Sequence, residues 1–384
     1  MSRIYRLFAT LLAATLLLAA CGDQPTAEAP EATSAPAEES EENVDDSEAA
    51  AEDQMEDAEP IDIKIDVVEQ IPGGFPAYNL PTDRLEILED RGDTVLVRHR
   101  FGETEVPKNP QRVFTDAATL PVALTLDLPI VASYYWDGIQ RIPTWEEQTE
   151  EVELIPSEDY SYNFEFLLAQ DPDLILAFSH IIYGSAEQET VYENLSAIAP
   201  TIVLFNDPAE LWPQATNELA QIFELSDEEA ARLENAGTTI AESCEPLRKT
   251  IGDDTVMVLQ PIDEEIWVIG PGWMDGGNFL PYSVTSHFYY FCGLNPPENL
   301  FDLVGTESSP ISQELIPEIQ ADYLFFYTYG DVDTDDILDN PLWQTIPAFQ
   351  KDQVYFSESV FGVSYDMTMV AIQDMVNLVT SENE

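Results

Sequence analysis

Apolar and polar side chains alternate at helical spacing across residues 226–251. The apolar or small residues recur three or four positions apart and so share one helix face, at Leu233, Ala236, Ile240, Cys244 and Leu247. Ser226 and Glu229 have the spacing of a capping box, in which each side chain bonds a free backbone N–H at the helix start. Pro246 should end or kink this helix near Glu245. The pattern predicts one helix of about 19 residues, roughly 28 Å long.

The chain on each side of this helix reads as strands that alternate with helices. On its N-terminal side the strand patterns are at 113–114, 130–133, 174–178 and 202–205, and the helical patterns are at 120–126, 163–169 and 191–198. Such alternation predicts a parallel sheet with helices on both faces. We therefore expect an α/β fold of two parallel-sheet lobes, 91–225 and 252–384, joined by the long helix 226–251, with a ligand cleft between the lobes.

The N-terminus has the pattern of an export signal, residues 1–20. Arg3 and Arg6 form its positive end, and the apolar run that follows is short for a membrane span. The run ends in the residues LAAC at 18–21, which resemble the lipobox of bacterial lipoproteins, where the cysteine receives lipid. We expect an exported protein that Cys21 anchors to the cell membrane, in a periplasm or at the outer face. The alternative is an ordinary secretory signal in which Cys21 has no role.

Residues 21–90 carry no pattern of a packed core. From Asp23 to Glu59 the chain is mostly Ala, Glu, Asp, Pro and Ser, so burial of apolar surface cannot offset its chain entropy. We expect an acidic disordered tether that holds the globular part away from the membrane. Residues 61–90 form an extension that the pattern does not place. A partner-binding acidic tail is the alternative interpretation of the tether.

The composition is strongly acidic, with 74 Asp and Glu against 14 Lys and Arg and a net charge of −60. Beyond Gly252 the only Lys or Arg is Lys351. Phosphate binding needs such side chains, so nucleic acid is excluded as a partner. An acidic surface of this kind is typical of salty surroundings, where ions screen the self-repulsion. Apart from Cys21 there are two cysteines, Cys244 and Cys292, which either form one disulfide or remain buried thiols.

Six segments follow one another across about residues 92–380. In order they are VPKNPQRVF, NFEFLLAQDPDLIL, YENLSAIAPTIV, VIGPGWMDGGNFL, SPISQELIPEIQADYLFFY and NPLWQTIPAFQKDQVYF. Together they resemble the bilobal substrate-binding proteins that deliver ferric siderophores, haem or cobalamin to ABC importers, and most of all the lipoproteins that bind ferric hydroxamates. The resemblance implies two α/β lobes joined by one rigid helix. It also implies a monomer without cofactor or catalytic activity, which hands its ligand to an ABC-transporter permease.

The ends of the predicted strands carry aromatic and polar side chains. Ligand sites in open α/β sheets lie outside the carboxyl ends of strands, and Tyr and Trp combine an apolar body with a polar tip. The candidates for the cleft are Tyr134, Tyr135, Trp136, Arg141, Tyr160, Tyr162, His180, Tyr183, Trp273, Phe361 and Tyr365. Each taken alone is more often a core or rim residue. Their shared position at strand ends favours ligand contact.

Comparison with hydroxamate-siderophore binders supports two of these positions and weakens the match at others. Tyr183 and the glycine after it match a pair at which those proteins touch their ligand, and Phe361 matches a contacting aromatic residue. The arginine that grips the iron centre in those proteins would fall at 157–159, which is acidic here. Arg141 is the substitute nearby. The matching tryptophan of the second lobe is Thr306 in this chain.

Charge distinguishes the classes of ligand that such a cleft could hold. Ferric catecholates carry about three negative charges, and burying them without Arg or Lys is prohibitive. We therefore expect a ferric siderophore that is neutral or weakly charged, of the hydroxamate or mixed type. Haem, cobalamin and a zinc or manganese ion are the alternatives. An ion site would depend on His180 and His287, because the third histidine, His99, lies in a predicted hairpin.

The sequence lacks the motifs of common enzymes. It contains no Gly-x-Ser-x-Gly elbow, phosphate-binding loop, Gly-x-Gly-x-x-Gly or His-Glu-x-x-His. A hydrolase built on two carboxylates is the remaining enzymatic alternative in so acidic a chain. We expect a binding protein and no enzyme.

Two glutamates match the positions at which this family docks on its permease. They are Glu165, in the segment Asn163-Phe164-Glu165, and Glu314, in the segment Ser312-Gln313-Glu314. The resemblance implies that each offers a carboxylate to an arginine of the permease. Both also lie near a predicted helix start, where the helix dipole favours a carboxylate, so helix capping is the alternative explanation.

Overall fold

The computed structural model describes most of the chain beyond residue 83. The described residues are 84–136, 139–140, 145–157, 160–184, 187–209, 211–262, 265–269, 273–275, 278–280, 286–300, 303, 309–328, 332–359 and 362–381. The chain divides into two units, Met1–Ala58 and Glu59–Glu384, and all the described residues belong to the second unit. The predicted signal peptide, Cys21 and the tether lie outside the described residues.

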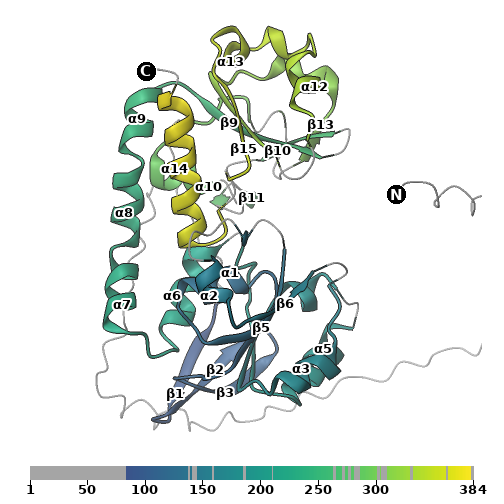
Figure 1. Cartoon of the computed structure of the whole chain (residues 1–384), viewed down its shortest axis with the longest axis vertical. Helices are drawn as coiled ribbons and strands as arrows, with labels where there is room; N and C mark the ends of the chain where they lie inside the picture. The colour runs from purple at the N-terminus through teal and green to yellow at the C-terminus, as the bar shows by residue number, and fades with distance from the viewer. Residues whose placement is uncertain are drawn as a thin grey trace, which may run out of the picture. The chain divides into compact units, whose positions relative to one another are not determined.

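A five-stranded sheet organises the chain before the connecting helices (Figure 1). Its order is β6-β5-β4-β7-β8, and every neighbouring pair is parallel, which confirms the predicted parallel sheet. Val113 and Phe114 point to opposite faces and both are fully buried, because both faces of the sheet are covered. The strands are β4 (Val113–Thr115), β5 (Ile130–Tyr135), β6 (Glu153–Pro156), β7 (Leu174–Ala177) and β8 (Thr201–Val203).

Short helices connect these strands. They are α1 (Leu120–Thr125), α2 (Trp145–Thr149), α3 (Phe164–Gln170), α4 (Ser179–Ile182), α5 (Gln188–Ser196) and α6 (Trp212–Ala220). Helix α3 begins where the Asn163 side chain accepts a hydrogen bond from the Phe166 amide at 3.0 Å. It ends at Asp171, whose φ of 49° is left-handed, a conformation common at helix ends. These caps fix the short connections, so the strand ends lie close to the helix starts.

A small antiparallel sheet precedes the parallel one. It consists of β1 (Glu86–Asp90), β2 (Thr94–His99) and β3 (Gly102–Pro107), with β2 in the centre. The Arg100 amide donates to the Val203 carbonyl at 3.1 Å, which attaches this sheet to the end of β8. The predicted hairpin that contains His99 is therefore present, and His99 is buried with 2% of its surface exposed.

The second five-stranded sheet is mixed. Its order is β13-β10-β9-β14-β15. Strand β14 is parallel to β9 and to β15, but β10 is antiparallel to both of its neighbours. The expectation of a wholly parallel sheet is wrong at this edge, because β9 turns directly into β10 as a hairpin, which requires antiparallel pairing. The strands are β9 (Val256–Ile262), β10 (Glu265–Ile269), β13 (Ser309–Ile311), β14 (Tyr323–Tyr327) and β15 (Val354–Ser357).

Short elements surround this second sheet. The helices are α12 (Thr334–Leu338), α13 (Pro347–Gln350) and the 3-10 helices η2 (Gln313–Glu318) and η3 (Trp343–Thr345). Strands β11 (Trp273–Asp275) and β12 (Asn278–Leu280) pair with each other as a two-stranded sheet. Trp343 and Phe326 pack edge to face in the core, with 5.3 Å between ring centroids. The second sheet thus has its own buried cluster on this face.

The predicted connecting helix consists of three segments, α7 (Asp227–Glu234), α8 (Ala236–Ser243) and α9 (Glu245–Ile251). The Ser226 hydroxyl accepts a bond from the Glu229 amide at 3.1 Å, as the capping pattern predicts. The residues of the predicted apolar face are all fully buried. Turns at Asn235 and Cys244 interrupt the helical run, and the one at Cys244 lies next to Glu245, where Pro246 is expected to end or kink the helix. The helical run also continues past Pro246, because a proline at the start of a helical segment removes no needed N–H.

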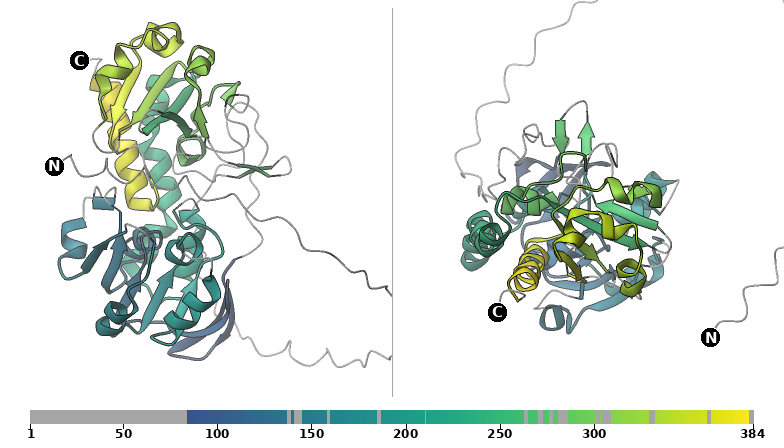
Figure 2. Two further views of the ribbon diagram at one scale, coloured as in Figure 1. Left: turned by 90° about the vertical axis from the view of Figure 1, so that its right-hand side faces the viewer. Right: turned by 90° about the horizontal axis from the view of Figure 1, so that it is seen from above.

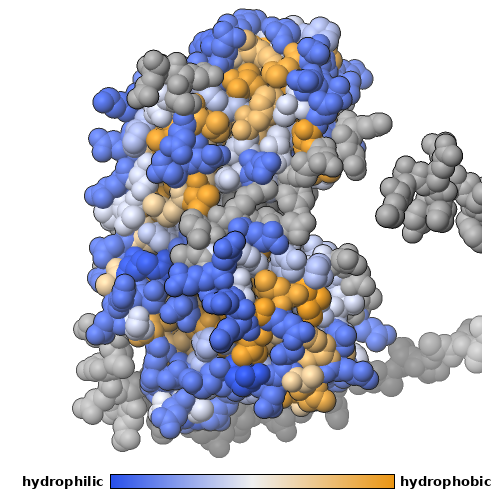
Figure 3. Space-filling model, in the orientation of Figure 1, coloured by the Kyte–Doolittle hydropathy of each residue, from blue (hydrophilic) through white to orange (hydrophobic). Residues whose placement is uncertain are grey.

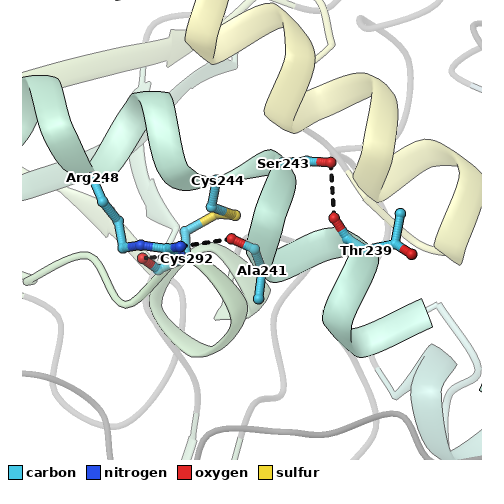
Figure 4. The surroundings of a disulfide bond; sticks show 6 residues. All are labelled: Thr239, Ala241, Ser243, Cys244, Arg248 and Cys292. Carbon is cyan, nitrogen blue, oxygen red and sulfur yellow. Dashed lines mark hydrogen bonds between the residues drawn. A yellow bond between two sulfur atoms is a disulfide. The ribbon is translucent and has the colours of Figure 1, made fainter. Parts of the chain in front are cut away.

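The C-terminal helix and a disulfide bond pack against these segments. Helix α14 (Tyr365–Ser381) lies beside α8 and α9 (Figures 1 and 2). Cys244, at the break between α8 and α9, is bonded to Cys292 at the end of α10 (Ser286–Cys292). Arg248 donates to the carbonyls of Cys292 and Ala241 on either side of the bond (Figure 4). Of the two states that the sequence left open for these cysteines, the structure therefore has the disulfide.

The surface combines hydrophilic and apolar areas. The face drawn in Figure 3 is largely hydrophilic, with apolar groups between the hydrophilic side chains. Among the described residues, no helix is both long enough and apolar enough to cross a membrane.

Candidate functional site

The order of the parallel sheet creates one preferred position for a ligand. From β4 the chain passes to β5 and β6 on one side, and then to β7 and β8 on the other. The carboxyl ends of β4 and β7 therefore flank a topological switch point, where open α/β sheets bind ligands. Asp116 follows β4 directly, and His180 is the third residue after β7. These two side chains therefore mark the expected position of the site.

A hollow of about 710 Å³ opens at this edge of the sheet. We call it the aromatic hollow, and its lining consists of Tyr134, Ile155, Pro156, Ser161, Tyr162, Asn163, Phe164, Glu165 and His180. These residues come from β5, from β6, from the segment that leads into α3 with the first turn of that helix, and from α4. Three of the predicted cleft residues, Tyr134, Tyr162 and His180, are among them.

Four tyrosine rings surround or adjoin the imidazole of His180. Tyr134 is stacked on it with 4.2 Å between ring centroids, and Tyr162 lies at 5.2 Å. Tyr160 meets it edge-on at 5.5 Å, and Tyr183 lies 6.1 Å from Tyr160. Five predicted site residues are therefore brought together in one cluster. Aromatic pairs of this kind contribute beyond their buried area, so the rings hold one another in place.

Exposure increases across this cluster from its base to its rim. His180 and Tyr134 are buried, whereas 42% of Tyr160 and 57% of Tyr183 are exposed. The Tyr183 hydroxyl donates to Asp207 at 2.7 Å, which orients the exposed ring. A tyrosine combines an apolar ring with a polar hydroxyl, so an exposed one can offer a ligand both kinds of contact. The rim tyrosines are therefore the side chains best placed to contact a ligand.

The buried base of the site is held by Asp116, which sequence reasoning missed. Its carboxylate has no exposed surface. Oδ2 accepts bonds from the amides of Phe178 at 2.6 Å and His180 at 3.2 Å, and Oδ1 accepts from the amide and hydroxyl of Thr119. The carboxylate thereby links the ends of β4 and β7. The sequence signal that could have identified it is an aspartate directly after the short strand Val113–Thr115.

The hydroxyl groups of Tyr162 and Tyr134 are held by hydrogen bonds to neighbouring residues. The Tyr162 hydroxyl donates to Asp116 Oδ2 at 3.4 Å. Burial, and then the negative charge of Asp116, raise the pKa of Tyr162 well above its usual range, so this phenol stays protonated. The Tyr134 hydroxyl accepts a bond from the Asn163 amide at 2.9 Å, which ties β5 to the start of α3.

The imidazole of His180 has polar groups at both nitrogens. Nε2 lies 3.3 Å from the Ser157 hydroxyl, and Nδ1 lies 3.2 Å from the Ser179 hydroxyl. Nδ1 is also 3.9 Å from Asp116 Oδ2. Hydroxyl groups can donate to or accept from either nitrogen, so this environment suits the ring in each tautomer.

Other predicted site residues lie elsewhere. Tyr135 points to the opposite face from Tyr134, since side chains alternate along a strand, and packs near Trp145. The indole N–H of Trp136 donates to the Ala117 carbonyl at 3.1 Å. Tyr365 is buried beneath the guanidinium of Arg232, 5.2 Å from it, and does not line the aromatic hollow.

Three predicted site residues cannot be placed. Arg141 and Phe361 lie outside the described residues, and so does the side chain of Trp273. Thr306, the position that matches the family's tryptophan, is also outside them. The two predicted docking glutamates are described, and both are exposed. Glu165 lies in the first turn of α3, and Glu314 lies in η2.

Two observations bear on alternatives to this site. Among the described residues, no group of three or more His, Cys, Asp or Glu side chains is arranged to hold a metal ion. A larger hollow of about 1260 Å³ lies at the opposite edge of the first sheet, beside Arg112, Ile130 and Glu153. Its lining contains no aromatic side chain, and it lies at the amino ends of the strands, so we regard the aromatic hollow as the better ligand site.

Comparison with known proteins gives consistent matches. The sequence profile of the periplasmic binding proteins matches residues 138–360. The iron(3+)-hydroxamate-binding protein FhuD of Bacillus subtilis is 23% identical over 269 residues, which cover 68% of this chain and 78% of that protein. The ferric enterobactin-binding periplasmic protein FepB of Escherichia coli is 23% identical over 285 residues, covering 70% and 85%. The solved structure of FhuD from S. pseudintermedius superposes with a TM-score of 0.58 at 20% identity, over 75% of this chain and 98% of that one.

Proposed function

Because this chain belongs to the periplasmic binding protein family, we propose that it captures a ferric siderophore outside the cytoplasm and delivers it to the permease of an ABC importer. The single observation that carries the proposal is the aromatic hollow, which lies at the switch point of a parallel sheet, with the exposed rings of Tyr160 and Tyr183 in the cluster around its His180. This is where such a fold presents side chains to a ligand. Binding and release, without chemical conversion, is the role of a binding protein.

The class of siderophore must be argued from this chain, since the relatives are named for different ligands. None of the described residues that line the aromatic hollow is Arg or Lys. A ferric complex with several negative charges would therefore lose its hydration there without gaining a cation. A hydroxamate or mixed complex, with little net charge, presents apolar edges and carbonyl oxygens that suit tyrosine rings and hydroxyls. We favour that class.

The proposal is tested by titration with ferric complexes. Tryptophan fluorescence should be quenched by a ferric trihydroxamate, with micromolar or tighter binding, about −8 kcal/mol or better. Tyr183→Ala should weaken this binding by about tenfold, because an exposed ring of the site is lost. Leu168→Ala is the matched control, since Leu168 is similarly exposed, at 64%, but lies outside the aromatic cluster. Tight binding of a ferric triscatecholate alone would reverse the ligand class, and binding of no ferric chelate would refute the function.

The membrane anchor is a separate part of the proposal. The residues LAAC at 18–21 support lipidation of Cys21, which would keep the protein near its permease. A Cys21→Ser protein should then leave the membrane fraction and appear in the soluble one. Continued partitioning of this variant with membranes would show that the anchor lies elsewhere. Docking on the permease through Glu165 and Glu314 is the third part, and its test is given in the Discussion.

A further inference from the structure

We propose that Asp116 sets the charge selectivity of the aromatic hollow. Its buried carboxylate makes the hollow prefer a ferric complex with a positive charge to a neutral complex, and a neutral complex to an anionic one. The inference rests on the proposed function, because it concerns the ligand of that same site. It goes further than the proposed function. A cleft that merely lacks cations could hold any ferric complex of low charge, whereas the aromatic hollow has a fixed negative charge behind its wall.

The position of the carboxylate is the first argument. Asp116 Oδ2 lies 3.4 Å from the Tyr162 hydroxyl and 3.9 Å from Nδ1 of His180. Both of these side chains line the hollow, so the charge lies one side chain behind its wall. Asp116 itself has no exposed surface, and a buried charge is screened by salt much less than a surface charge.

The partners of the carboxylate are the second argument. Its donors are the amides of Ala118, Thr119, Phe178 and His180 and the hydroxyls of Thr119 and Tyr162. All of these are neutral dipoles, which stabilise the anion but do not cancel its charge. A neutral set of donors therefore leaves a net negative potential at the hollow.

The basic side chains on neighbouring segments are the third argument. Arg100 donates to the Phe205 carbonyl at 2.7 Å, and Lys108 pairs with Asp90 at 2.6 Å. Arg112 donates to the carbonyls of Gln170 and Asp171, at the far end of α3 from the hollow. These cations are thus engaged away from the site. Within the described part of the chain, no Arg or Lys lines the hollow to offset Asp116, and the exposed carboxylate of Glu165, which does line it, adds to the negative charge there.

The state of Tyr162 indicates what kind of iron compound fits. Its raised pKa keeps the phenol protonated, so Tyr162 offers a hydroxyl and not a phenolate. Bare ferric iron needs anionic oxygen ligands, whereas a chelate brings a complete coordination shell. The hollow therefore suits an intact chelate that is recognised from outside. A cationic group on the periphery of that chelate would be attracted towards Asp116 through its neutral shell of donors.

The test uses one ferric trihydroxamate scaffold in three charge forms. A terminal amine gives the cationic form, its acetyl derivative is neutral, and its succinyl derivative is anionic. Dissociation constants are measured with the full mature chain at pH 8, in low and in high salt. We expect affinity to fall by about tenfold per unit of charge from cation to anion, the size expected for charges roughly 12 Å apart at an effective dielectric constant of about 20.

Substitutions separate Asp116 from the general charge of the protein. Asp116→Asn should bring the three affinities within about threefold of one another. Asp171→Asn is the matched control, because it also removes one carboxylate, but an exposed one. Asparagine readily adopts the left-handed backbone conformation of this position. This variant should leave the order of the three affinities unchanged. If Asp116→Asn does not fold, Tyr162→Phe provides the second test. It removes one donor from the carboxylate, so the preference for the cationic form should increase.

Five outcomes decide between the inference, its alternatives and the proposed function. The expected charge order, reduced by Asp116→Asn or increased by Tyr162→Phe, supports it. Equal affinities for the three forms overturn it, although the proposed function stands. The inference is also overturned if Asp116→Asn and Asp171→Asn change the charge order equally, or if the order disappears in high salt. Either result would mean that the surface charge of the protein causes the order. If the wild type prefers the anionic form and Arg141→Gln removes that preference, Arg141 sets the selectivity and not Asp116. Failure of all three forms to bind refutes the proposed function itself.

Discussion

Arg232 on α7 and Asp366 in the first turn of α14 form an ion pair, with 3.1 Å between Nη1 and Oδ1. The same guanidinium donates to Glu229 and to the backbone carbonyl of Thr125, the last residue of α1. Its central carbon lies 5.2 Å from the centroid of the Tyr365 ring. The other oxygen of Asp366 accepts a bond from the Thr125 hydroxyl at 3.0 Å. One side chain thus joins α1 of the first sheet, the connecting helices and the C-terminal helix.

Replacing Arg232 should therefore destabilise the fold. Arg232→Met leaves Asp366 half-buried without its cation, and we expect a loss of about 2 kcal/mol in the free energy of unfolding. Arg91→Met is the matched control, because Arg91 also pairs with two carboxylates but at an exposed site, where solvent screens the pairs and the loss should be much smaller. Urea denaturation of both variants measures the difference. Equal losses would show that the Arg232 contacts do not join the elements energetically.

The disulfide between Cys244 and Cys292 should be a major source of stability. It closes a loop with a sequence separation of 48 residues, and loop entropy predicts a contribution of about 4 kcal/mol. The Cys244→Ser/Cys292→Ser protein should unfold at lower denaturant, as should the wild type after reduction. The double variant should not respond to reductant. A wild type whose unfolding curve is the same with and without reductant would contradict this expectation.

Acid should destabilise the protein through His99. Burial lowers its pKa from 6.5 to about 4, and its Nδ1 accepts a bond from the Val203 amide at 3.3 Å, which requires the neutral ring. Between these two values the unfolded chain binds the proton and the folded chain does not. The free energy of unfolding therefore falls as the pH is lowered from about 6.5 to about 4, by about 3 kcal/mol in total.

The pH dependence of one variant isolates this effect. His99→Gln lacks the titrating ring, so its free energy of unfolding should change less between pH 7 and pH 4 than that of the wild type. The difference between the two proteins, measured by urea denaturation at several pH values, should follow the His99 window. Parallel pH profiles for both proteins would mean that other groups cause the acid sensitivity.

The two exposed glutamates should matter for import. Glu165→Ala with Glu314→Ala removes the proposed contacts with permease arginines, so siderophore uptake by cells should be lost. Thermal stability should stay nearly unchanged, because exposed carboxylates contribute only about 0–1 kcal/mol. Glu165 also lines the aromatic hollow, so ligand affinity is measured in parallel, and lost uptake counts as a docking defect only where that affinity is kept. Glu189→Ala, at an exposed position in the first turn of α5, controls for loss of a helix-start carboxylate. Normal uptake by the double variant would place the docking surface elsewhere.

Local features of the fold could be predicted from the sequence because they depend on residues near one another in the chain. The Ser226 cap and the buried face of residues 233–247 follow from spacing along one helix. The parallel first sheet follows from alternating strands and helices, and the position of the site follows from the rule that ligands lie at strand ends. By the same reasoning Tyr134, Tyr160, Tyr162, His180 and Tyr183 were selected together.

Features that depend on contacts between distant segments were decided only by the tertiary structure. Asp116 and the His180 amide that it binds are 64 residues apart, and no local pattern joins them. Tyr134 and Tyr135 are equivalent in the sequence, but the strand register directs only Tyr134 towards the hollow. The pairing of Cys244 with Cys292 and the breaks in the connecting helix likewise depend on what packs against them. Spacing determines which face a side chain occupies, whereas packing determines what that face meets.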